Sequence, residues 1–513
     1  MVHIWQGAAV VTGRRRPEGL ETFQDGAVAV EGDRVVAVGR GTDVRSRYPD
    51  AELTIMPSGV VVPGFVNGHH HQGLSPVRRG ARAMSLEHVF THRRTLAGPA
   101  LYEDTLYGAL QLLAAGVTTV NHLHVGRRGP WEEWRRDADT VLAAYSEAGL
   151  RVNFTFNFRD QNRLLYDNDA WFEANLPHDL RGQMASFLAR QEIPLQTYLS
   201  ELFVGLWEDH GRNGGAMARI SLAPHNLHWC SDEAIIAIAD VAARHNVHLN
   251  VHLLESQRQK LYALRRTGTT AIQHLRNLGV LDQRLTLLHA IWATADDVEL
   301  LAQAQTRVCS SIGSNLLMGS GIPPLAYMRD RGVPLSVGLD EGGLDGRSDV
   351  FSDLRLTQGV QQRASQLSQT ISCDEALAMA TSGAAASTEF RDDVGMLEPG
   401  RYADFMVVDW DAVNDPGGPT GPTLVDDLVY KACTAHIDTV VVGGREVVRK
   451  GRHTWLDRED IARRVREQLR AQKESDDGQR ELLHAVRPFV DKYWESYGEP
   501  ENLTPFQAYN STR

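Results

Sequence analysis

Cysteines and long apolar runs are both scarce in this chain of 513 residues. The four cysteines lie far apart and form no CxxC pair, so they provide no disulfide framework. No apolar run is long enough to span a bilayer, and the arginines near the N-terminus follow the first apolar residues, which is the reverse of a secretory signal. These features predict a protein of the reducing cytoplasm without a membrane partner.

Positively charged residues are also fewer than negatively charged ones. The 53 lysines and arginines are outnumbered by 65 aspartates and glutamates, which gives a net charge of −12. This balance argues against a polyanionic partner such as a nucleic acid. A hydrophobic content of 42% and a charged content of 23% are typical of a soluble globular protein. The length suffices for a large barrel plus a second domain, or for two to three average domains.

Short apolar runs alternate with longer helix-like segments from Val60 to about Asp340. Helical spacing of apolar residues is clear in segments such as 232–244 and 296–305. This alternation predicts a (β/α)₈ barrel. A doubly wound sheet is the competing architecture, but chemistry-bearing residues follow most of the strands rather than one switch point. The eight predicted strands are residues 60–66, 116–121, 150–156, 218–223, 247–252, 285–289, 306–310 and 334–340.

The segments outside the barrel differ in character. Residues 1–59 and 391–455 contain short strand-like runs and turns, which predicts one small β-sandwich domain built from both chain ends. The barrel is then expected over residues 60–390. Residues 456–513 form a helical C-terminal extension, which we expect to pack against the body or against a partner subunit.

Four candidate metal ligands follow three of the predicted strands. His69 and His71 end the run Val61 to His71, and alternate residues of a strand face the same side, so both imidazoles can point to one place. His252 and Asp340 end the fifth and eighth strands, and all these ends meet at one mouth of a barrel. Any one histidine alone is better explained as a hydrogen-bonded core residue, but the combination favours one divalent transition metal, zinc first, with iron or manganese as alternatives.

Further polar residues lie beside these ligands. Glu255 follows His252 closely and can transfer a proton to a substrate, although a first-turn glutamate of a helix is the ordinary alternative. His289 and His225 end the sixth and fourth strands, where barrel chemistry occurs. His228, like His122 and His124, fits a site role and a core role equally well. His248 lies deeper and is expected to fill the barrel.

The chain resembles the amidohydrolase superfamily. The resemblance rests on PGFVNGHHH, SLAPHNLHWC, HLLE, LLHAIW, SSIGSNLLMGSGIPP, GLDEGG, LEPGRYADFMVVD and VVVGGREVVRKG, which occur in order from the N-terminus to about residue 452. They are most similar to the mononuclear branch of heterocycle aminohydrolases and triazine chlorohydrolases, related to cytosine deaminase.

The resemblance implies a role for each site residue. It implies metal ligation by His69, His71, His252 and Asp340. It also implies Glu255 as proton shuttle, His289 as orienter of the hydrolytic water, and His225 as a substrate contact. Asn315 matches an asparagine that follows the seventh strand, whose role stays open.

Lysine is the other scarce residue, and its scarcity decides the number of metals. The binuclear branch of the superfamily bridges two metals with a carbamylated lysine at the end of the fourth strand. This chain has Ile220 to His225 there, and Lys260 is the single lysine of the predicted barrel. A carbamate-bridged pair of metals is therefore excluded, and one metal is predicted.

Two features depart from the family pattern. Glu341 stands where a glycine is usual, and it adds a carboxyl group that favours a cationic or amine-bearing substrate. The connection from Asn157 to Met217 is long, and we expect it to form a lid or a pocket wall rather than a peripheral insertion. Candidates for stacking on a flat ring, which can equally be packing residues, are Trp292, Trp229, Phe158 and Trp171.

The predicted activity is hydrolytic deamination of a small nitrogen heterocycle by a metal-bound hydroxide, with Asp340 and His289 expected to take up and direct the proton of the bound water. Glu255 favours a heterocycle, because a ring C=N is a poor electrophile until its nitrogen is protonated. Displacement of halide or alkylamine, or hydrolysis of a cyclic amide or urea, would use the same ligands and is the alternative. A catalytically silent binding protein is disfavoured because every expected ligand is present. The expected partners are the heterocyclic substrate and further copies of the chain, in a homodimer or larger homo-oligomer.

Overall fold

The computed structural model describes residues 1–498 apart from residues 72, 81–83, 93–94, 97, 126–128, 189–192, 212–214, 363–369 and 475–477. The last fifteen residues of the predicted helical extension, 499–513, therefore lie outside the described part. Among the described residues, none of the helices combines the length and the apolar character that crossing a bilayer requires. The four cysteines all lie in described segments and are free thiols.

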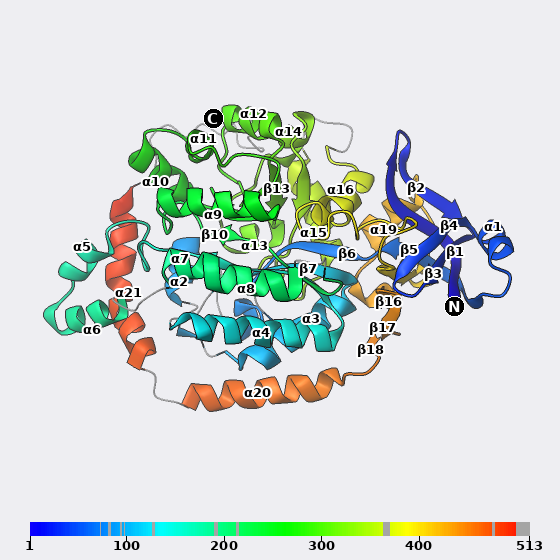
Figure 1. Cartoon of the computed structure of the whole chain (residues 1–513), viewed down its shortest axis with the longest axis horizontal. Coiled ribbons are helices and arrows are strands. Elements are labelled where there is room, and N and C mark those ends of the chain that lie inside the picture. The colour runs from blue at the N-terminus through cyan, green and yellow to red at the C-terminus, as the bar shows by residue number, and fades with distance from the viewer. Residues whose placement is uncertain are drawn as a thin grey trace.

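One sheet of nine strands contains strands from both ends of the chain. Its central pairing joins β5 to β15 in antiparallel register, with Val61 opposite Val407, so segments about 350 residues apart in sequence are neighbours. Figure 1 shows these strands gathered at one end of the molecule. The strands are β1 Val2–Arg16, β2 Gly19–Gln24, β3 Gly26–Glu31, β4 Arg34–Arg40, β5 Glu52–Pro63, β15 Phe405–Asp409, β16 Ile437–Val442, β17 Arg445–Arg449 and β18 Arg452–His453.

The remaining strands form two parallel sheets. The first has the order β10-β8-β7-β6, with β9 also on β8, and the second has the order β11-β12-β13-β14. Two parallel bridges connect the sheets, Leu222 with Leu249 and His70 with Asp340. The strands are β6 Phe65–His70, β7 Val117–His124, β8 Arg151–Phe158, β9 Ala218–Ile220, β10 Ala223–Pro224, β11 Leu249–Leu253, β12 Leu285–His289, β13 Arg307–Ser310 and β14 Leu335–Val337.

The strand predicted at residues 60–66 is divided between two sheets. Val60 to Pro63 end β5 in the nine-stranded sheet, and Phe65 begins β6 in a parallel sheet. Sequence reasoning merged them because both segments are buried on both faces and therefore give one continuous apolar run.

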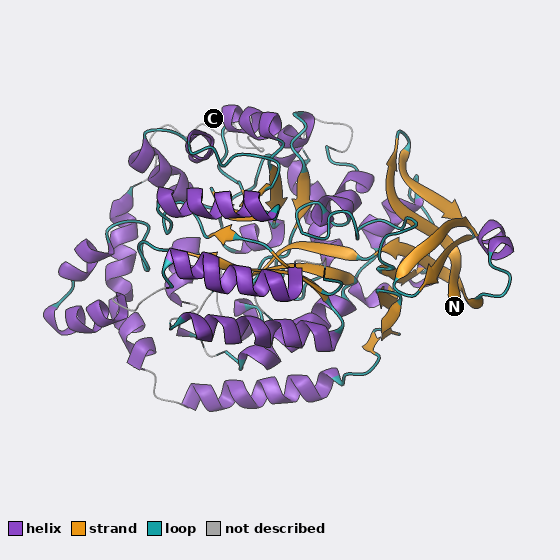
Figure 2. Ribbon diagram, viewed as in Figure 1, coloured by secondary structure: helices purple, strands orange, loops and turns teal. Residues whose placement is uncertain are grey.

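Helices cover the outer faces of the parallel strands (Figure 2). The longer ones are α3 Leu101–Ala114, α4 Trp131–Ala148, α6 His178–Leu188, α9 Asp232–His245, α10 Gln257–Thr267, α12 Ala295–Ala304, α15 Val350–Gln361, α20 Arg458–Glu474 and α21 Gly478–Tyr497. The shorter ones are α2 Leu86–His92, α5 Asp169–Ala174, α7 Leu195–Thr197, α8 Val204–Leu206, α11 Ala271–Asn277, α13 Ile312–Leu317, α14 Leu325–Asp330, α16 Cys373–Met379, α17 Ser382–Ala385 and α19 Leu424–Lys431. Two further short helices, α1 Gly41–Arg47 and α18 Trp410–Asn414, contact strands of the nine-stranded sheet instead.

Local capping explains where the two predicted helices begin and end. The side chain of Ser231 accepts a hydrogen bond from the Ala234 N–H at the start of α9, and Asn246 ends that helix in the left-handed conformation. Thr294 and Asp297 form a reciprocal capping box at the start of α12. The segments predicted at 232–244 and 296–305 therefore match α9 and α12 within one residue at each end.

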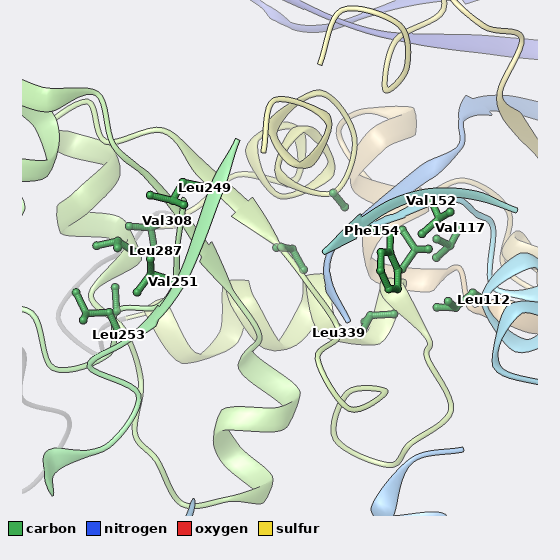
Figure 3. Packing of buried hydrophobic residues seen from close by; sticks show 14 of the residues in the cluster. Leu112, Val117, Val152, Phe154, Leu249, Val251, Leu253, Leu287, Val308 and Leu339 are labelled. Atoms are coloured by element: carbon green, nitrogen blue, oxygen red, sulfur yellow. The ribbon is translucent and has the colours of Figure 1, made fainter. Parts of the chain in front are cut away.

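Alternation along β11 separates an apolar outer face from a polar inner face. Leu249, Val251 and Leu253 belong to the large hydrophobic core, and Figure 3 shows them beside Leu287 and Val308 of the neighbouring strands. Asn250 and His252 occupy the alternate positions and point the other way. The metal-ligand candidate therefore lies on the inner face because its neighbours in sequence fill the core.

Asparagine side chains connect the two parallel sheets through the inner face. Asn121 on β7 donates to the side chain of Asn250 on β11 at 3.1 Å and to the Gly68 carbonyl at 2.9 Å. Asn153 on β8 donates to Asn121 at 2.7 Å and to Ser221 at 3.0 Å. Buried amides of this kind are tolerated because they satisfy one another.

Candidate active site and metal centre

Three histidines and one aspartate converge at the ends of the parallel strands. Nε2 of His69 and Nε2 of His71 each lie 3.3 Å from Oδ1 of Asp340. Nε2 of His252 lies 3.2 Å from Nε2 of His71. Potential ligand atoms of His69, His71 and His252 lie within 4.8 Å of one another, and so do those of His69, His289 and Asp340. The four side chains singled out as metal ligands from the sequence are thus brought to one place.

Hydrogen bonds on the far side of these rings fix how they point. Nδ1 of His71 lies 2.8 Å from the Leu123 carbonyl oxygen. Because a carbonyl can only accept, Nδ1 carries the proton and donates it, and Nε2 keeps its lone pair toward the cluster. The hydroxyl of Ser314 donates to Oδ2 of Asp340 at 2.6 Å and leaves Oδ1 toward His69 and His71. Such outer contacts orient the ligands of a metal centre.

Asn67 holds the two strand ends together. Its Oδ1 accepts the Leu339 N–H at 2.8 Å and the His69 N–H at 3.3 Å, and the Asp340 N–H donates to the His69 carbonyl at 2.8 Å. Asp340 has a φ of +50°, a left-handed conformation that costs a side-chain-bearing residue about 1 kcal/mol or more. The surrounding hydrogen bonds stabilise this geometry and direct the carboxylate into the cluster.

The protonation states of the cluster match those of metal ligands. Burial lowers the pKa of His69 to about 3, and burial together with the neighbouring imidazoles lowers the pKa of His252 well below its usual value. Burial alone would raise the pKa of Asp340, but His69 and His71 outweigh it and hold that pKa well below the usual range. Neutral imidazoles beside a carboxylate are the form that binds a cation.

A buried nitrogen without a hydrogen-bond partner also fits a metal. Nε2 of His69, the ring nitrogen that faces Asp340, is buried and has no hydrogen-bond partner among the described residues. Buried polar atoms normally find a partner, so unsatisfied ones in a cluster need an explanation. Three nitrogens and one oxygen form a donor set that suits a divalent zinc ion.

Glu255 and His289 lie at the edge of this cluster. Nε2 of His289 is 3.8 Å from Oε2 of Glu255, and its Nδ1 donates to Oδ1 of Asn315 at 3.0 Å. The side chain of Asn315 therefore holds the imidazole with the lone pair of Nε2 toward the pocket. The sequence left the role of Asn315 open and grouped it with the substrate contacts. This contact places it behind the ring of His289, and it does not line the described pocket.

A pocket lies over the cluster and is lined by polar residues together with apolar residues of α2 and Met318. His225 and Glu341 are part of its wall, as their positions in the sequence predicted. The lining residues are His71, Leu86, Val89, Phe90, His225, Asn226, His252, Glu255, His289, Met318, Asp340 and Glu341. We refer to Leu86, Val89, Phe90 and Met318 as the apolar roof.

Several predicted substrate contacts lie outside this lining. The indole N–H of Trp292 donates to the Ser320 carbonyl at 2.8 Å, and the ring of His228 packs against that of Tyr166 with 4.0 Å between the ring centroids. Trp229 lies behind the wall, 4.7 Å from the ring of His225. Trp171 is 52% exposed on α5. None of these four residues lines the described pocket.

The other histidines are accounted for by local contacts. His122 lies 2.7 Å from the Tyr145 hydroxyl on α4, on the outer side of β7, and His124 stands beside it. His248 bonds to Glu389 at 2.9 Å and to the Ala386 carbonyl at 3.0 Å, at the end of β11 opposite the cluster. The periodicity of the sequence did not separate these inner and outer positions, because all the strand residues are buried.

Sequence reasoning missed three groups of site residues, namely Asn67, Ser314 and the apolar roof. Asn67 lies within the PGFVN motif and Ser314 next to Asn315, so both were adjacent to motifs that had been recognised. The apolar roof is not adjacent to a recognised motif, and the spacing of Leu86, Val89 and Phe90 is that of any helix with one apolar face.

Comparisons with known proteins agree with this arrangement. The model of the amidohydrolase family matches residues 60–447, and that of a bacterial imidazolonepropionase-like composite domain matches residues 26–51. A 5-methylthioadenosine/S-adenosylhomocysteine deaminase of Pelotomaculum thermopropionicum is 26% identical over 89% of this chain and 95% of its own length. The corresponding enzyme of Thermodesulfovibrio yellowstonii is 23% identical over 86% of this chain and 92% of its own length.

Solved structures show the same fold. An adenosine deaminase from Xanthomonas campestris with bound zinc gives a TM-score of 0.74 at 21% identity, covering 92% of this chain and 98% of its own. Atrazine chlorohydrolase from Arthrobacter aurescens, complexed with zinc, gives a TM-score of 0.75 at 24% identity, and the match covers 91% of this chain and 99% of its own. The family resemblance inferred from the sequence motifs is confirmed, and the parallel sheets with the nine-stranded sheet fit a TIM-type barrel plus a β domain. The chain belongs to the amidohydrolase family.

Proposed function

We propose that this protein is a metal-dependent hydrolase that removes an exocyclic amine from a small nitrogen heterocycle. The observation that carries the proposal is the convergence of His69, His71, His252 and Asp340 on one point, with Glu255 and His289 at its edge. Family membership supports hydrolysis, and the curated relatives named above are deaminases.

Zinc is the metal we propose for this centre, with iron as the alternative, and one ion per chain. His69, His71, His252 and Asp340 would hold it. When bound, such an ion lowers the pKa of water toward about 7 and so supplies a nucleophile at neutral pH.

The chain's own residues then have distinct roles. We assign Glu255 the protonation of the ring nitrogen next to the attacked carbon, because it lines the pocket without belonging to the ligand cluster. His289 orients the attacking water through the Nε2 lone pair, which its bond to Asn315 turns toward the pocket. Protonation of the ring nitrogen by a positioned acid contributes about 10²- to 10⁴-fold to the rate.

The substrate class that we propose first is a 6-aminopurine nucleoside or a derivative changed at the 5′ position. Curated relatives carry the names 5-methylthioadenosine/S-adenosylhomocysteine deaminase and 5′-deoxyadenosine deaminase. The pocket combines the apolar roof with polar ligands, which suits a flat ring that stacks on apolar side chains and reacts at the polar groups. His225 and Glu341 would contact this substrate.

We also infer that the two parallel sheets close into one eight-stranded barrel over residues 64–390, because residues 60–63 belong to β5 of the nine-stranded sheet. The bridges from Leu222 to Leu249 and from His70 to Asp340 support this closure. Residues 1–63 and 391–455 would form the β-sandwich domain, and residues 456–513 the C-terminal extension. The cytoplasmic location and the homodimer or larger assembly stay predictions, and sedimentation velocity would test the assembly.

The test is a product screen with the zinc-loaded full chain. Adenosine, 5′-methylthioadenosine, a pterin, cytosine and a chlorotriazine would be supplied separately, and ammonia and chloride measured. We expect ammonia in amounts equal to the substrate consumed. Release of chloride without ammonia would show that the activity is halide displacement and not deamination. Failure to form a product from any of these substrates would contradict the proposal.

A further inference from the structure

Glu87 is a buried carboxylate that the proposed mechanism does not use. It lies on α2, the helix whose neighbouring residues Leu86, Val89 and Phe90 form most of the apolar roof, and its side chain is absent from the pocket lining. Only 2% of Glu87 is exposed. A buried carboxylate destabilises a protein unless hydrogen bonds or positive charges compensate for its lost hydration.

Three groups from two other segments compensate for it. The Tyr166 hydroxyl donates to Oε1 of Glu87 at 3.0 Å, the Ser256 hydroxyl donates to the same oxygen at 2.5 Å, and the Arg258 guanidinium lies 3.4 Å from Oε2. Burial, with the added effect of Glu87, raises the pKa of Tyr166 well above 10, so this hydroxyl stays protonated and can donate.

The bond to Ser256 connects Glu87 to the proposed proton shuttle. Ser256 directly follows Glu255 and caps α10 by accepting the Gln259 N–H at 3.3 Å. The side chain of Gln259 in turn accepts the Glu255 N–H at 2.9 Å. A chain of hydrogen bonds through Gln259 and Ser256 therefore connects the backbone of Glu255 to the carboxylate of Glu87.

The C-terminal helix supports the same helix α2 from outside. The ring of Trp494 on α21 packs on Tyr166 at 4.8 Å, and Asp491 lies 3.2 Å from Nε2 of His88. Figure 1 shows α21 running past α5 and α6 at the end of the molecule away from the nine-stranded sheet. The contacts of α21 thus reach both α2, through His88, and Tyr166, which donates to Glu87.

We propose that Glu87 is a positioning residue that fixes the roof helix α2 and Glu255 relative to each other. The proposal rests on the function proposed above for the part that concerns Glu255 as proton shuttle. Without the carboxylate, Ser256 loses its acceptor and α2 loses its link to the loop that carries Glu255. Displacement of a reacting group by about 1 Å can cost on the order of 100-fold in rate.

The first test measures local opening and needs no substrate. Hydrogen exchange of the full-length chain would be followed in the peptide covering residues 253–262 for Glu87→Ala, Glu87→Gln and Asp491→Ala. Glutamine keeps an oxygen that can accept from Tyr166 and Ser256, and Asp491→Ala removes the contact of α21 with His88 of α2. We expect exchange about tenfold faster in this peptide for Glu87→Ala, and wild-type exchange for the other two.

The second test measures coupling to Glu255. In a double-mutant cycle, Glu87→Ala should lower kcat about 100-fold in the wild-type background and less than about twofold in the Glu255→Gln background, with metal content unchanged. Equal losses in both backgrounds would show that Glu87 acts elsewhere and would overturn the inference. If the wild-type chain deaminates nothing, the proposed function fails, and the exchange measurement decides the positioning role alone.

The remaining outcomes are also decisive. Unchanged exchange at residues 253–262 in Glu87→Ala would overturn the proposal, as would faster exchange spread evenly over the chain. If Glu87→Ala does not fold, Ser256→Ala breaks the same link and leaves the carboxylate with Tyr166 and Arg258. It should give the same local increase in exchange, and wild-type exchange in that variant would contradict the proposed role.

Discussion

The hydroxyl of Ser314 donates a hydrogen bond of 2.6 Å to Oδ2 of Asp340, while Oδ1 of the same carboxylate faces His69 and His71. One oxygen of Asp340 is thus occupied by the protein and the other faces the proposed metal. The contact makes Ser314 part of the centre although it is not a ligand.

Replacing Ser314 by alanine should weaken metal binding. The free Oδ2 would allow Asp340 to rotate, and loss of such an outer contact typically costs about 10- to 100-fold in metal affinity. The measurement is competition for zinc against a chelator of known affinity. Ser311→Ala is the matched control, because the Ser311 hydroxyl is buried nearby without a hydrogen-bond partner among the described residues. Equal affinities of the two variants would contradict the role of Ser314.

Glu255→Gln should keep one metal per chain and lose most of its turnover. Glutamine fills the same space but cannot protonate a ring nitrogen, so kcat should fall about 10²- to 10⁴-fold. Metal content and ammonia release measured on the same preparation separate the two effects. A variant with near wild-type turnover would show that Glu255 is not the proton shuttle.

Removing Asp404 should destabilise the protein strongly. Nε and Nη2 of Arg151 donate to its two carboxylate oxygens at 3.0 and 2.9 Å, and both side chains are buried. Asp404→Ala leaves a buried guanidinium unpaired, which typically costs about 3–5 kcal/mol in the free energy of unfolding.

Urea unfolding would measure that loss of stability. Asp460→Ala serves as the control, because it breaks the contact of Asp460 with Arg463 at the exposed surface of α20, where an ion pair contributes about 0–1 kcal/mol. A loss of stability no larger for Asp404→Ala than for Asp460→Ala would refute the importance of the buried pair.

Asp353 should make stability depend on pH in a direction opposite to most carboxylates. Burial raises its pKa to about 7, although the Gly313 N–H that donates to it at 2.9 Å acts in the opposite direction. Because the folded-state pKa lies above the ordinary value of 3.8, the contribution of Asp353 to stability is full below pH about 4 and is lost as pH rises through about 7.

Asp353→Asn should remove this pH dependence. Asparagine keeps an oxygen for the Gly313 N–H and does not titrate, so the difference in unfolding free energy between variant and wild type should grow from pH 4 to pH 8 in favour of the variant. Unfolding curves at several pH values would measure it. A constant difference across that range would mean that Asp353 ionises normally in the folded chain.

The metal-ligand candidates could be predicted because residues of metal-ligand type directly end apolar strand segments. His69, His71, His252 and Asp340 differ sharply from the apolar residues before them, and parallel strands bring their ends together. The division of residues 60–66 between two sheets could not be predicted, since Val60 to Val66 are buried in both. The placement of Leu86, Phe90 and Glu87 depends on tertiary packing of α2 against α21 and Tyr166, for which local periodicity gives no signal.

The single-metal centre can be tested by measuring the metal content of the purified full chain after it is reloaded with zinc and freed of loosely bound ions. We expect about one zinc per chain in the wild type. We expect almost none in His252→Ala and in Asp340→Ala, provided that both variants unfold cooperatively. Two tightly held ions per wild-type chain, or one ion retained in both variants, would contradict a single centre held by these residues.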